Sequence, residues 1–219
     1  MGITFIRGGV YKPRTSPYSF QGLEEKGLEY FAEVKKELDI KVVTEVISFD
    51  KIDIVSHVAD IIQIGSRNMQ NYPLLKELGK AGKPVLFKRG MAATIDEYLN
   101  SAEYLLANGN MNVILCERGI KTFETSTRNT LDLNAVPVIK EKSHLPVFVD
   151  PSHGIGIRDK VTPMALAGIA CGADGLLVEV HTNPDKALSD GGQTLTIPMF
   201  KELVDKAKLF SYLVGKTVN

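Results

Sequence analysis

The sequence predicts an α/β fold of the (β/α)8 TIM-barrel class, and three observations lead to this prediction. Short apolar runs rich in valine and isoleucine recur along the chain, and amphipathic stretches lie between most of them. Such alternation is typical of parallel strands that are buried on both faces and joined by helices. Nearly every apolar run also ends in charged or polar residues. In an open sheet only the strands near the switch point need such ends, whereas in a barrel the carboxyl ends of all strands meet at one mouth.

The expected elements follow one another in a regular order. The strands are expected within residues 3–9, 40–46, 60–66, 83–90, 111–119, 145–154 and 175–181. Amphipathic helices are expected within residues 22–38, 94–109, 161–173 and 197–216. The count is seven strands, whereas a closed barrel of this class has eight. A βα unit takes about 30 residues, and the first run begins almost at Met1. We therefore expect the first βα unit of the barrel to be missing.

The composition describes one globular domain that spans residues 1–219. The chain is 44% hydrophobic and 24% charged, its formal net charge is zero, and no linker or low-complexity tract interrupts it. A net charge of zero argues against binding to nucleic acids or anionic membranes, because proteins that bind them usually carry an excess of Lys and Arg. No apolar run reaches transmembrane length, and no secretory leader opens the chain. Cys116 and Cys171 form no disulfide framework or metal motif, so we expect a cytoplasmic protein with reduced thiols.

Basic residues gather at the ends of the expected strands. Any one of them is more often a surface charge paired with an acid, but a neutral protein has no general reason to pool six at equivalent positions of a barrel. The pooled charge suits one or two small substrates that carry phosphate and carboxylate groups. In "KPRT", Pro13 fixes its own φ and pushes Lys12 into an extended conformation, so the loop is stiff before a substrate arrives. The six residues are Arg7, Lys12, Arg14, Arg67, Lys88 and Arg118.

Three residues near the last two strand ends are candidate metal ligands. His153 lies in "VDPSHG", Glu179 in "VEVH" and Asp190 in "ALSDGGQ". A mixed nitrogen and oxygen set on neighbouring loops suits a divalent first-row metal. The signal is weak by itself, because a lone histidine is more often structural. His181 alternates with Glu179 along the strand and is expected beside the ligands rather than among them. Three ligands without a thiol also leave room for a fourth.

Six motifs of the chain resemble those of the class I (beta-type) 3-deoxy-D-arabino-heptulosonate 7-phosphate (DAHP) synthases. They cover nearly the whole chain and occur in the order of that family. They read "RGGVYKPRTSPYSFQG", "ADIIQIGSRNMQN", "PVLFKRGMAAT", "VILCERGIKTFE", "VDPSHGIGIRDKV" and "VEVHTNPDKALSDGGQTL".

The resemblance implies a transferase of the shikimate pathway, which condenses phosphoenolpyruvate with erythrose 4-phosphate and releases phosphate. It implies a divalent metal (Mn, Fe, Co or Zn) and a homo-oligomer, either a dimer or a tetramer. It implies metal ligands at His153, Glu179 and Asp190, and catalytic roles for Lys12 and His153. The positions that match the phosphoenolpyruvate site are Arg7, Lys12, Gly65, Ser66, Arg67, Lys88 and Arg118, and those that match the erythrose 4-phosphate site are Lys12, Pro13, Arg14 and Thr15.

The chain departs from this family in two places. Gly191-Gly192 stands where the family usually has Gly-Pro, which is expected to loosen the Asp190 loop. The family's first strand, which ends in Gly-Pro-Cys-Ser and carries a fourth metal ligand, has no counterpart, and neither Cys116 nor Cys171 replaces it by motif.

Two alternatives stay open. One is a non-catalytic, shortened barrel that binds phosphorylated ligands or a partner. The other is the sister enzyme 3-deoxy-D-manno-octulosonate 8-phosphate synthase, whose loop carries Asn where this chain has "KPRT".

Overall fold

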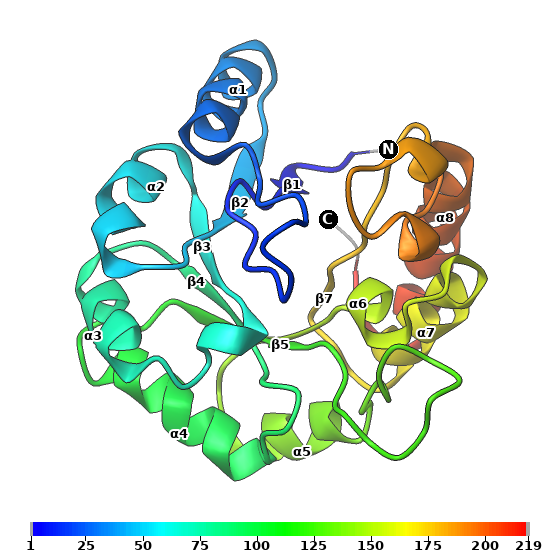
Figure 1. Cartoon of the computed structure of the whole chain (residues 1–219). Helices are drawn as coiled ribbons and strands as arrows, with labels where there is room; N and C mark the ends of the chain where they lie inside the picture. Colours follow the sequence, from blue (N-terminus) through cyan, green and yellow to red (C-terminus); the bar gives the residue numbers. More distant parts are fainter. Residues whose placement is uncertain (1, 218–219) are drawn as a thin grey trace. The chain divides into compact units, whose positions relative to one another are not determined.

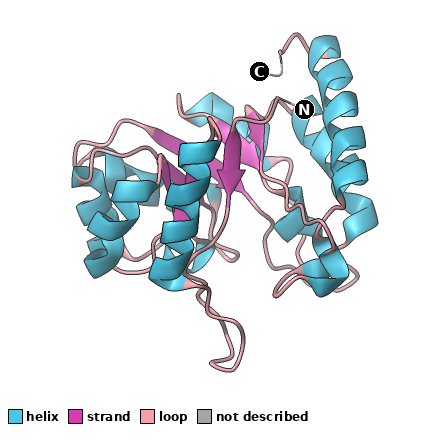
Figure 2. Ribbon diagram, turned by 90° about the horizontal axis from the view of Figure 1, so that it is seen from above, coloured by secondary structure: helices cyan, strands magenta, loops and turns pink. Residues whose placement is uncertain are grey.

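A computed structural model describes residues 2–217 of the chain, in which short strands alternate with helices (Figure 1). The strands are β1 (Phe5–Arg7), β2 (Lys41–Glu45), β3 (Ile61–Ile64), β4 (Val85–Lys88), β5 (Val113–Glu117), β6 (Val147–Val149) and β7 (Gly175–Leu176). The helices are α1 (Glu24–Glu37), α2 (Ile52–Val58), α3 (Tyr72–Lys80), α4 (Ile95–Leu106), α5 (Ala135–Lys142), α6 (Pro151–Ile155), α7 (Arg158–Ala170) and α8 (Ile197–Leu213). Figure 2 shows how short the strands are beside most of the helices.

The strand order confirms the predicted fold class. The strands follow each other in sequence order, from β1 to β7, and the pairs β1–β2, β2–β3, β3–β4, β5–β6 and β6–β7 are parallel. Parallel neighbours in chain order, each joined to the next by a helical connection, are the building pattern of TIM-barrel folds. Within residues 2–217 the structure has the seven strands that the sequence predicts.

The chain divides into two compact units that are interleaved in sequence. One comprises residues 2–90 and 96–114, and it carries β1 to β4 with the first residues of β5. The other comprises residues 91–95 and 115–217, and it carries the rest of β5 with β6 and β7. The two units are called the amino-terminal unit and the carboxy-terminal unit below.

The core of the amino-terminal unit lies between its strands and helices. Ile62 and Ile64 of β3 and Phe87 of β4 are fully buried. Tyr98 of α4 is also fully buried; its ring packs against that of Phe87, and its hydroxyl donates to the Phe87 carbonyl oxygen. Partnering the hydroxyl lets the tyrosine bury its ring without leaving a polar group unsatisfied.

The carboxy-terminal unit packs α7 and α8 on a cluster of aliphatic residues. Val161 and Ala165 of α7 are buried with Leu195 and with Leu203 of α8. Helix α8 begins after Thr196, whose hydroxyl accepts a hydrogen bond from the Met199 N–H. A capping threonine is a common start signal for a helix, and it fixes where the apolar face of α8 begins.

A lysine–aspartate clamp holds the start of a strand in the amino-terminal unit. The Asp60 carboxylate, just before β3, accepts hydrogen bonds from Lys35 Nζ of α1 at 2.7 Å and from the Val42 N–H of β2 at 2.8 Å. Burial raises the pKa of Asp60, but the hydrogen bonds from Lys35 and Val42 outweigh it, so the pKa lies below its ordinary value.

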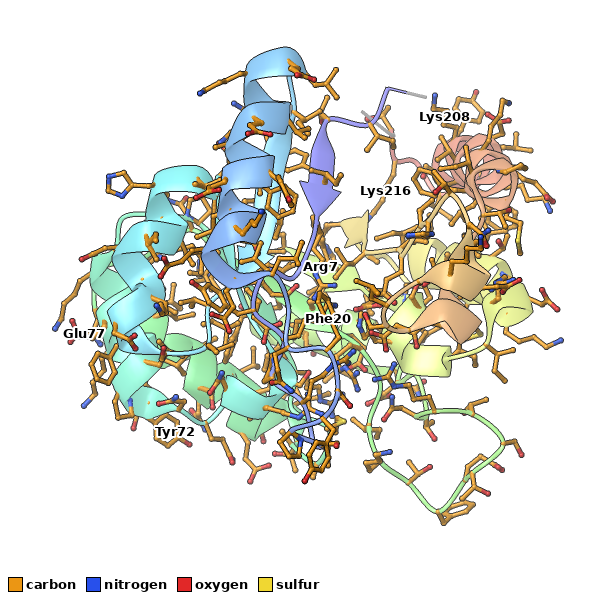
Figure 3. The ribbon with its side chains drawn as sticks, turned by 45° about the horizontal axis from the view of Figure 1, so that its top comes forward. Arg7, Phe20, Tyr72, Glu77, Lys208 and Lys216 are labelled. Atoms are coloured by element: carbon orange, nitrogen blue, oxygen red, sulfur yellow. The ribbon has the colours of Figure 1, made fainter. Side chains whose placement is uncertain are left out.

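A second clamp of the same kind lies in the carboxy-terminal unit. The Asp174 carboxylate, just before β7, accepts from Lys140 Nζ of α5 at 2.8 Å and from the Val147 N–H of β6 at 2.9 Å. Lys216, labelled in Figure 3, adds a contact of 3.2 Å to the same carboxylate. In each clamp, a lysine from a helix and a backbone N–H near the start of one strand both donate to the aspartate that precedes the following strand.

Two sequence expectations about the strands are wrong. The first concerns β1 alone, which is not buried on both faces: Phe5 and Ile6 are exposed at 52% and 44%, and only β2 pairs with this strand among the described ones. The second is the length of β7, which ends at Leu176 instead of reaching Glu179. Beyond it, Val180 forms a parallel bridge with Leu195, so the backbone pairs with a later loop rather than continuing the strand.

Among residues 2–217, no helix has both the length and the apolar character that crossing a membrane requires.

Candidate active site

Arg7 is the first of the expected cations, and it stands at the end of β1 (Figure 3). Its Nε donates to Gln63 Oε1 at 3.0 Å, and its Nη2 lies 3.9 Å from Glu45 Oε2. Gln63 Nε2 donates in turn to Glu45 Oε2 at 2.8 Å. Arg7 is therefore held by a polar pair on the next two strands, in which Glu45 and Gln63 are register partners.

Glu45 is a carboxylate set among cations in the amino-terminal unit. Burial raises the pKa of Glu45, and the nearby charges of Arg7, Lys88 and Lys12 oppose that rise. Gly65 contacts this carboxylate so closely that a side chain at position 65 would overlap the Glu45 oxygens. Neither Glu45 nor Gln63 was among the site residues predicted from the sequence. A glutamine inside the apolar run "DIIQIG" was the available signal.

Hydrogen bonds to residues 20–21 and from Arg67 hold the "KPRT" loop in place. The Lys12 N–H donates to the Gln21 carbonyl oxygen at 2.8 Å, and Arg14 Nε donates to the Phe20 carbonyl oxygen at 3.1 Å. Arg67 comes from the turn after β3, and its guanidinium donates to the Pro13 carbonyl oxygen at 2.9 Å and to Thr15 Oγ1 at 3.3 Å. The structure thus brings Arg67 onto the loop that carries Lys12 and Arg14.

Two more predicted cations are buried at strand ends. Lys88 closes β4 in the amino-terminal unit and is 3% exposed. Arg118 follows β5 in the carboxy-terminal unit and is 6% exposed. Burial lowers the pKa of the Arg118 guanidinium, and the negative charge of Asp150 counteracts it. Buried cations are costly unless they meet negative charge, and Glu45 lies near Lys88 and Asp150 near Arg118 to supply it.

The three predicted metal ligands lie together in the carboxy-terminal unit. One potential ligand atom from each of His153, Glu179 and Asp190 lies within 4.8 Å of those from the other two. All three side chains are partly buried. Neither cysteine belongs to this cluster, which is the one such group found among the described residues. Cys116 lies buried in β5 and Cys171 caps the end of α7, as expected.

His153 has a carboxylate near each of its ring nitrogens. Asp150 caps α6, and its Oδ1 accepts the His153 N–H at 2.9 Å. Its Oδ2 lies 2.7 Å from His153 Nδ1, which leaves Nε2 facing Glu179 Oε1 at 3.4 Å. A carboxylate on one ring nitrogen and an oxygen ligand beside the other is the usual setting of a metal-binding histidine. The residues present therefore fit a divalent cation.

Glu179 and Asp190 are held by neighbours that the sequence analysis did not identify. The Glu179 N–H donates to Ser152 Oγ at 3.0 Å, and Gln193 Nε2 donates to Glu179 Oε2 at 2.6 Å. Arg128 Nη1 donates to Asp190 Oδ1 at 3.0 Å. Asp190 has φ of +57°, in the left-handed region that Asp and Asn tolerate best after glycine. Gln193 lies within the motif "VEVHTNPDKALSDGGQTL" but was not among the predicted site residues, and Arg128 lies in a polar loop outside the six motifs.

The loop at Gly191-Gly192 forms a short 3-10 helix, η4 (Gly191–Gln193). Arg158 of α7 donates to the Gly191 carbonyl oxygen at 2.9 Å, and Thr194 Oγ1 donates to the Asp190 carbonyl oxygen at 2.8 Å. His181 is exposed, and its Nδ1 accepts the Asn183 N–H at 3.0 Å, so it lies outside the ligand cluster.

Comparison with known proteins identifies the family. The sequence model of the DAHP synthetase I family matches residues 2–211. The chain belongs to this family. Across all 219 residues it is 56% identical to the phospho-2-dehydro-3-deoxyheptonate aldolase of Thermotoga maritima. A second member of the comparison, the 2-dehydro-3-deoxyphosphooctonate aldolase of Azoarcus sp., is 31% identical over 230 aligned residues, which cover 98% of this chain and 81% of the relative.

Two solved structures resemble this DAHP synthetase I chain over its full length. The crystal structure of DAHP synthase from T. maritima gives a TM-score of 0.96 at 56% identity, and a truncated form of the synthase from the same organism gives 0.92 at 51%. The chain covers 64% of the first of these and 79% of the second. It spans 65% of the length of the T. maritima aldolase. The family resemblance and the barrel class expected from the sequence are confirmed.

Proposed function

We propose that this chain catalyses, or forms the catalytic part of a protein that catalyses, the condensation of phosphoenolpyruvate with erythrose 4-phosphate to give DAHP and phosphate. The reaction is the first step of the shikimate pathway. The observation that carries the proposal is the 56% identity over all 219 residues to a phospho-2-dehydro-3-deoxyheptonate aldolase. The strand-end cations and the His–Glu–Asp cluster supply the groups that this chemistry requires.

The cations bind the two phosphorylated substrates in this proposal. Arginine offers a planar pair of donors to phosphate or carboxylate, and lysine offers a compact charge. Phosphoenolpyruvate is assigned to Arg7, Lys12, Arg67, Lys88 and Arg118, with the backbone at Gly65 and Ser66. Erythrose 4-phosphate is assigned to Lys12, Pro13, Arg14 and Thr15.

The chemical step joins C3 of phosphoenolpyruvate to the aldehyde carbon of erythrose 4-phosphate. The aldehyde oxygen gains a proton, water adds at C2, and phosphate leaves as its C–O bond breaks. Lys12 is assigned to both substrates, so its ammonium group is our candidate for the proton donor. The burial of Lys88 and Arg118 places fixed positive charge in surroundings with little water, where it stabilises developing negative charge more strongly.

A divalent metal is held by His153, Glu179 and Asp190 in this proposal, and His153 is then also catalytic. When bound, such a metal polarises a carbonyl group toward attack. Asp150 keeps the His153 ring in the orientation that points Nε2 at the cluster. Mn, Fe, Co and Zn all accept this nitrogen and oxygen set.

Two further proposals concern the surroundings of the protein. We infer a homo-oligomer, a dimer or tetramer, from the family resemblance. We infer a cytoplasmic location because the proposed substrates are metabolites of the cell interior. Light scattering of the purified chain and fractionation of cells test these points.

A product assay separates the candidate functions. The purified chain is supplied with Mn²⁺, phosphoenolpyruvate and either erythrose 4-phosphate or arabinose 5-phosphate, and released phosphate is measured while the sugar product is identified by mass spectrometry. We expect turnover with erythrose 4-phosphate. Turnover only with arabinose 5-phosphate would group the chain with enzymes such as the 2-dehydro-3-deoxyphosphooctonate aldolase of Azoarcus sp., to which it is 31% identical. Binding of both substrates without turnover would support the non-catalytic alternative for this chain.

A further inference from the structure

Arg128 lies in the segment between β5 and α5 and contacts the loop that carries Asp190. A single guanidinium nitrogen, Nη1, donates to Asp190 Oδ1 at 3.0 Å and to Gln193 Oε1 at 2.7 Å. Two N–H groups on one nitrogen can serve both acceptors at once. The arginine therefore links a predicted metal ligand to an amide three residues further along.

The contact continues from the amide to a second predicted ligand. Gln193 is 3% exposed, and its Nε2 donates to Glu179 Oε2 at 2.6 Å. The order of contacts is thus Asp190, Arg128, Gln193, Glu179. Because the Gln193 oxygen is occupied by Arg128, the amide is fixed in the orientation that presents its NH₂ group to Glu179.

The backbone around Arg128 also contacts the turn that carries His153. The Arg128 N–H donates to the Ile155 carbonyl oxygen at 3.0 Å, and Asn129 Nδ2 donates to the His153 carbonyl oxygen at 2.8 Å. Gly156 ends α6 with φ of +73°, and a side chain there would overlap the stem of Arg128. The arginine is therefore anchored through its main chain and its stem as well as through its charge.

An ordinary surface ion pair does not account for this arrangement. The Arg128 side chain is 40% exposed and that of Asp190 is 13% exposed, and an isolated pair of this kind contributes little to stability. An isolated ion pair would not include the buried Gln193 amide, which connects Arg128 to Glu179. Side chains that orient metal ligands typically change metal affinity about 10–100-fold when they are lost.

We propose that Arg128 is a positioning residue of the metal site, which fixes the Asp190 carboxylate directly and the Glu179 carboxylate through Gln193. The proposal rests on the metal site of the proposed function. It makes a prediction opposite to that of simple electrostatics. A nearby positive charge alone would repel a divalent cation, so its removal would tighten binding.

The experiment measures Mn²⁺ affinity of the metal-free protein by isothermal titration calorimetry. We expect Arg128→Met to weaken binding about 10–100-fold and Gln193→Leu to weaken it by a similar factor. Combining the two should weaken it less than the product of the single effects, because both interrupt one series of contacts. Lys186→Met is the matched control; it removes one exposed positive charge from the same loop and should leave the affinity unchanged.

A second readout is the visible absorption of bound Co²⁺, which reports the geometry of its ligands. Arg128→Met should alter the band shape, whereas Lys186→Met should not. Thermal unfolding of the metal-free variants identifies any loss of folding, and if Arg128→Met does not fold, Arg128→Lys and Gln193→Leu decide the question.

Equal or tighter Mn²⁺ binding by Arg128→Met, with an unchanged Co²⁺ spectrum, would overturn the positioning role. Failure of the unchanged protein to bind Mn²⁺ would overturn both this inference and the metal assignment. Normal metal results without DAHP formation would refute the proposed reaction and leave the positioning role intact.

Discussion

Removing the Asp60 carboxylate should destabilise the protein in a pH-dependent way. Asp60 Oδ2 accepts from Lys35 Nζ and from the Val42 N–H, and the two charged side chains are 27% and 25% exposed. Solvent screens a pair with this exposure, so the ion pair contributes about 0.5–1 kcal/mol. Asp60→Asn loses that contribution but keeps an oxygen for Val42. Asp60→Ala also leaves the N–H of the buried Val42 without this acceptor, which raises the total loss to about 2–3 kcal/mol.

The pH dependence follows from the direction of the pKa shift. The pKa of Asp60 in the folded protein lies below its ordinary value of 3.8. The unfolded chain therefore binds the proton more tightly, and the stabilisation by the carboxylate is fully present above about pH 4. It is lost as the pH falls through the lower, folded pKa. Above that window the difference between the unchanged protein and Asp60→Asn should be constant.

Urea unfolding followed by circular dichroism tests this at pH 7 and at steps down to pH 3. Asp205→Asn is the control, because Asp205 pairs with Lys201 on the exposed face of α8. It should leave the unfolding midpoint unchanged. Equal midpoints for Asp60→Ala and the unchanged protein at pH 7 would refute the clamp. So would an Asp60→Asn difference that stays constant, or grows, down to pH 3.

Three predictions concern the site. Arg14→Lys should raise KM for erythrose 4-phosphate about tenfold or more and alter KM for phosphoenolpyruvate little, since lysine lacks the paired donors of arginine; steady-state kinetics that show equal effects would move Arg14 to another role. Ala at His153 or Glu179 should abolish metal-dependent turnover while the circular dichroism spectrum persists, and full activity in the presence of chelator would contradict the metal assignment. Gly65→Ala should lower the melting temperature and weaken phosphoenolpyruvate binding, because the new methyl group meets the Glu45 carboxylate; unchanged calorimetric affinity would show that this backbone does not approach the substrate.

The sequence was informative about elements and about residues with strong chemical character. Apolar runs bounded by charged residues located all seven strands, since burial and β-propensity act locally. His153, Glu179 and Asp190 were identified through motifs, and the structure brings them within 4.8 Å of one another. The early end of β7 was not predictable, because the pairing of Val180 with Leu195 depends on the path of a later loop.

The contacts that orient the site could not be read in the same way. Arg128 and Gln193 are 65 residues apart, and Glu45 and Gln63 are 18 apart. Arginine, glutamine and glutamate are ordinary surface residues, so only the three-dimensional fold distinguishes a bridging side chain from a solvated one. The sequence contained one sign of the Glu45–Gln63 pair, which is the glutamine inside an apolar run, and no sign of the role of Arg128.

The left-handed backbone at Asp190 limits how the position can change in evolution. Glutamate could supply the same carboxylate, but it adopts a φ near +57° less readily than aspartate or asparagine, although Glu24 of this chain has φ of +51°. Asparagine adopts that backbone readily, yet it carries no charge for a metal or for Arg128. Glycine suits the backbone best and has no ligand atom. Aspartate alone combines a carboxylate with ready access to this conformation, so a library of all substitutions at this position should return only the original residue when it is selected for metal binding and stability together.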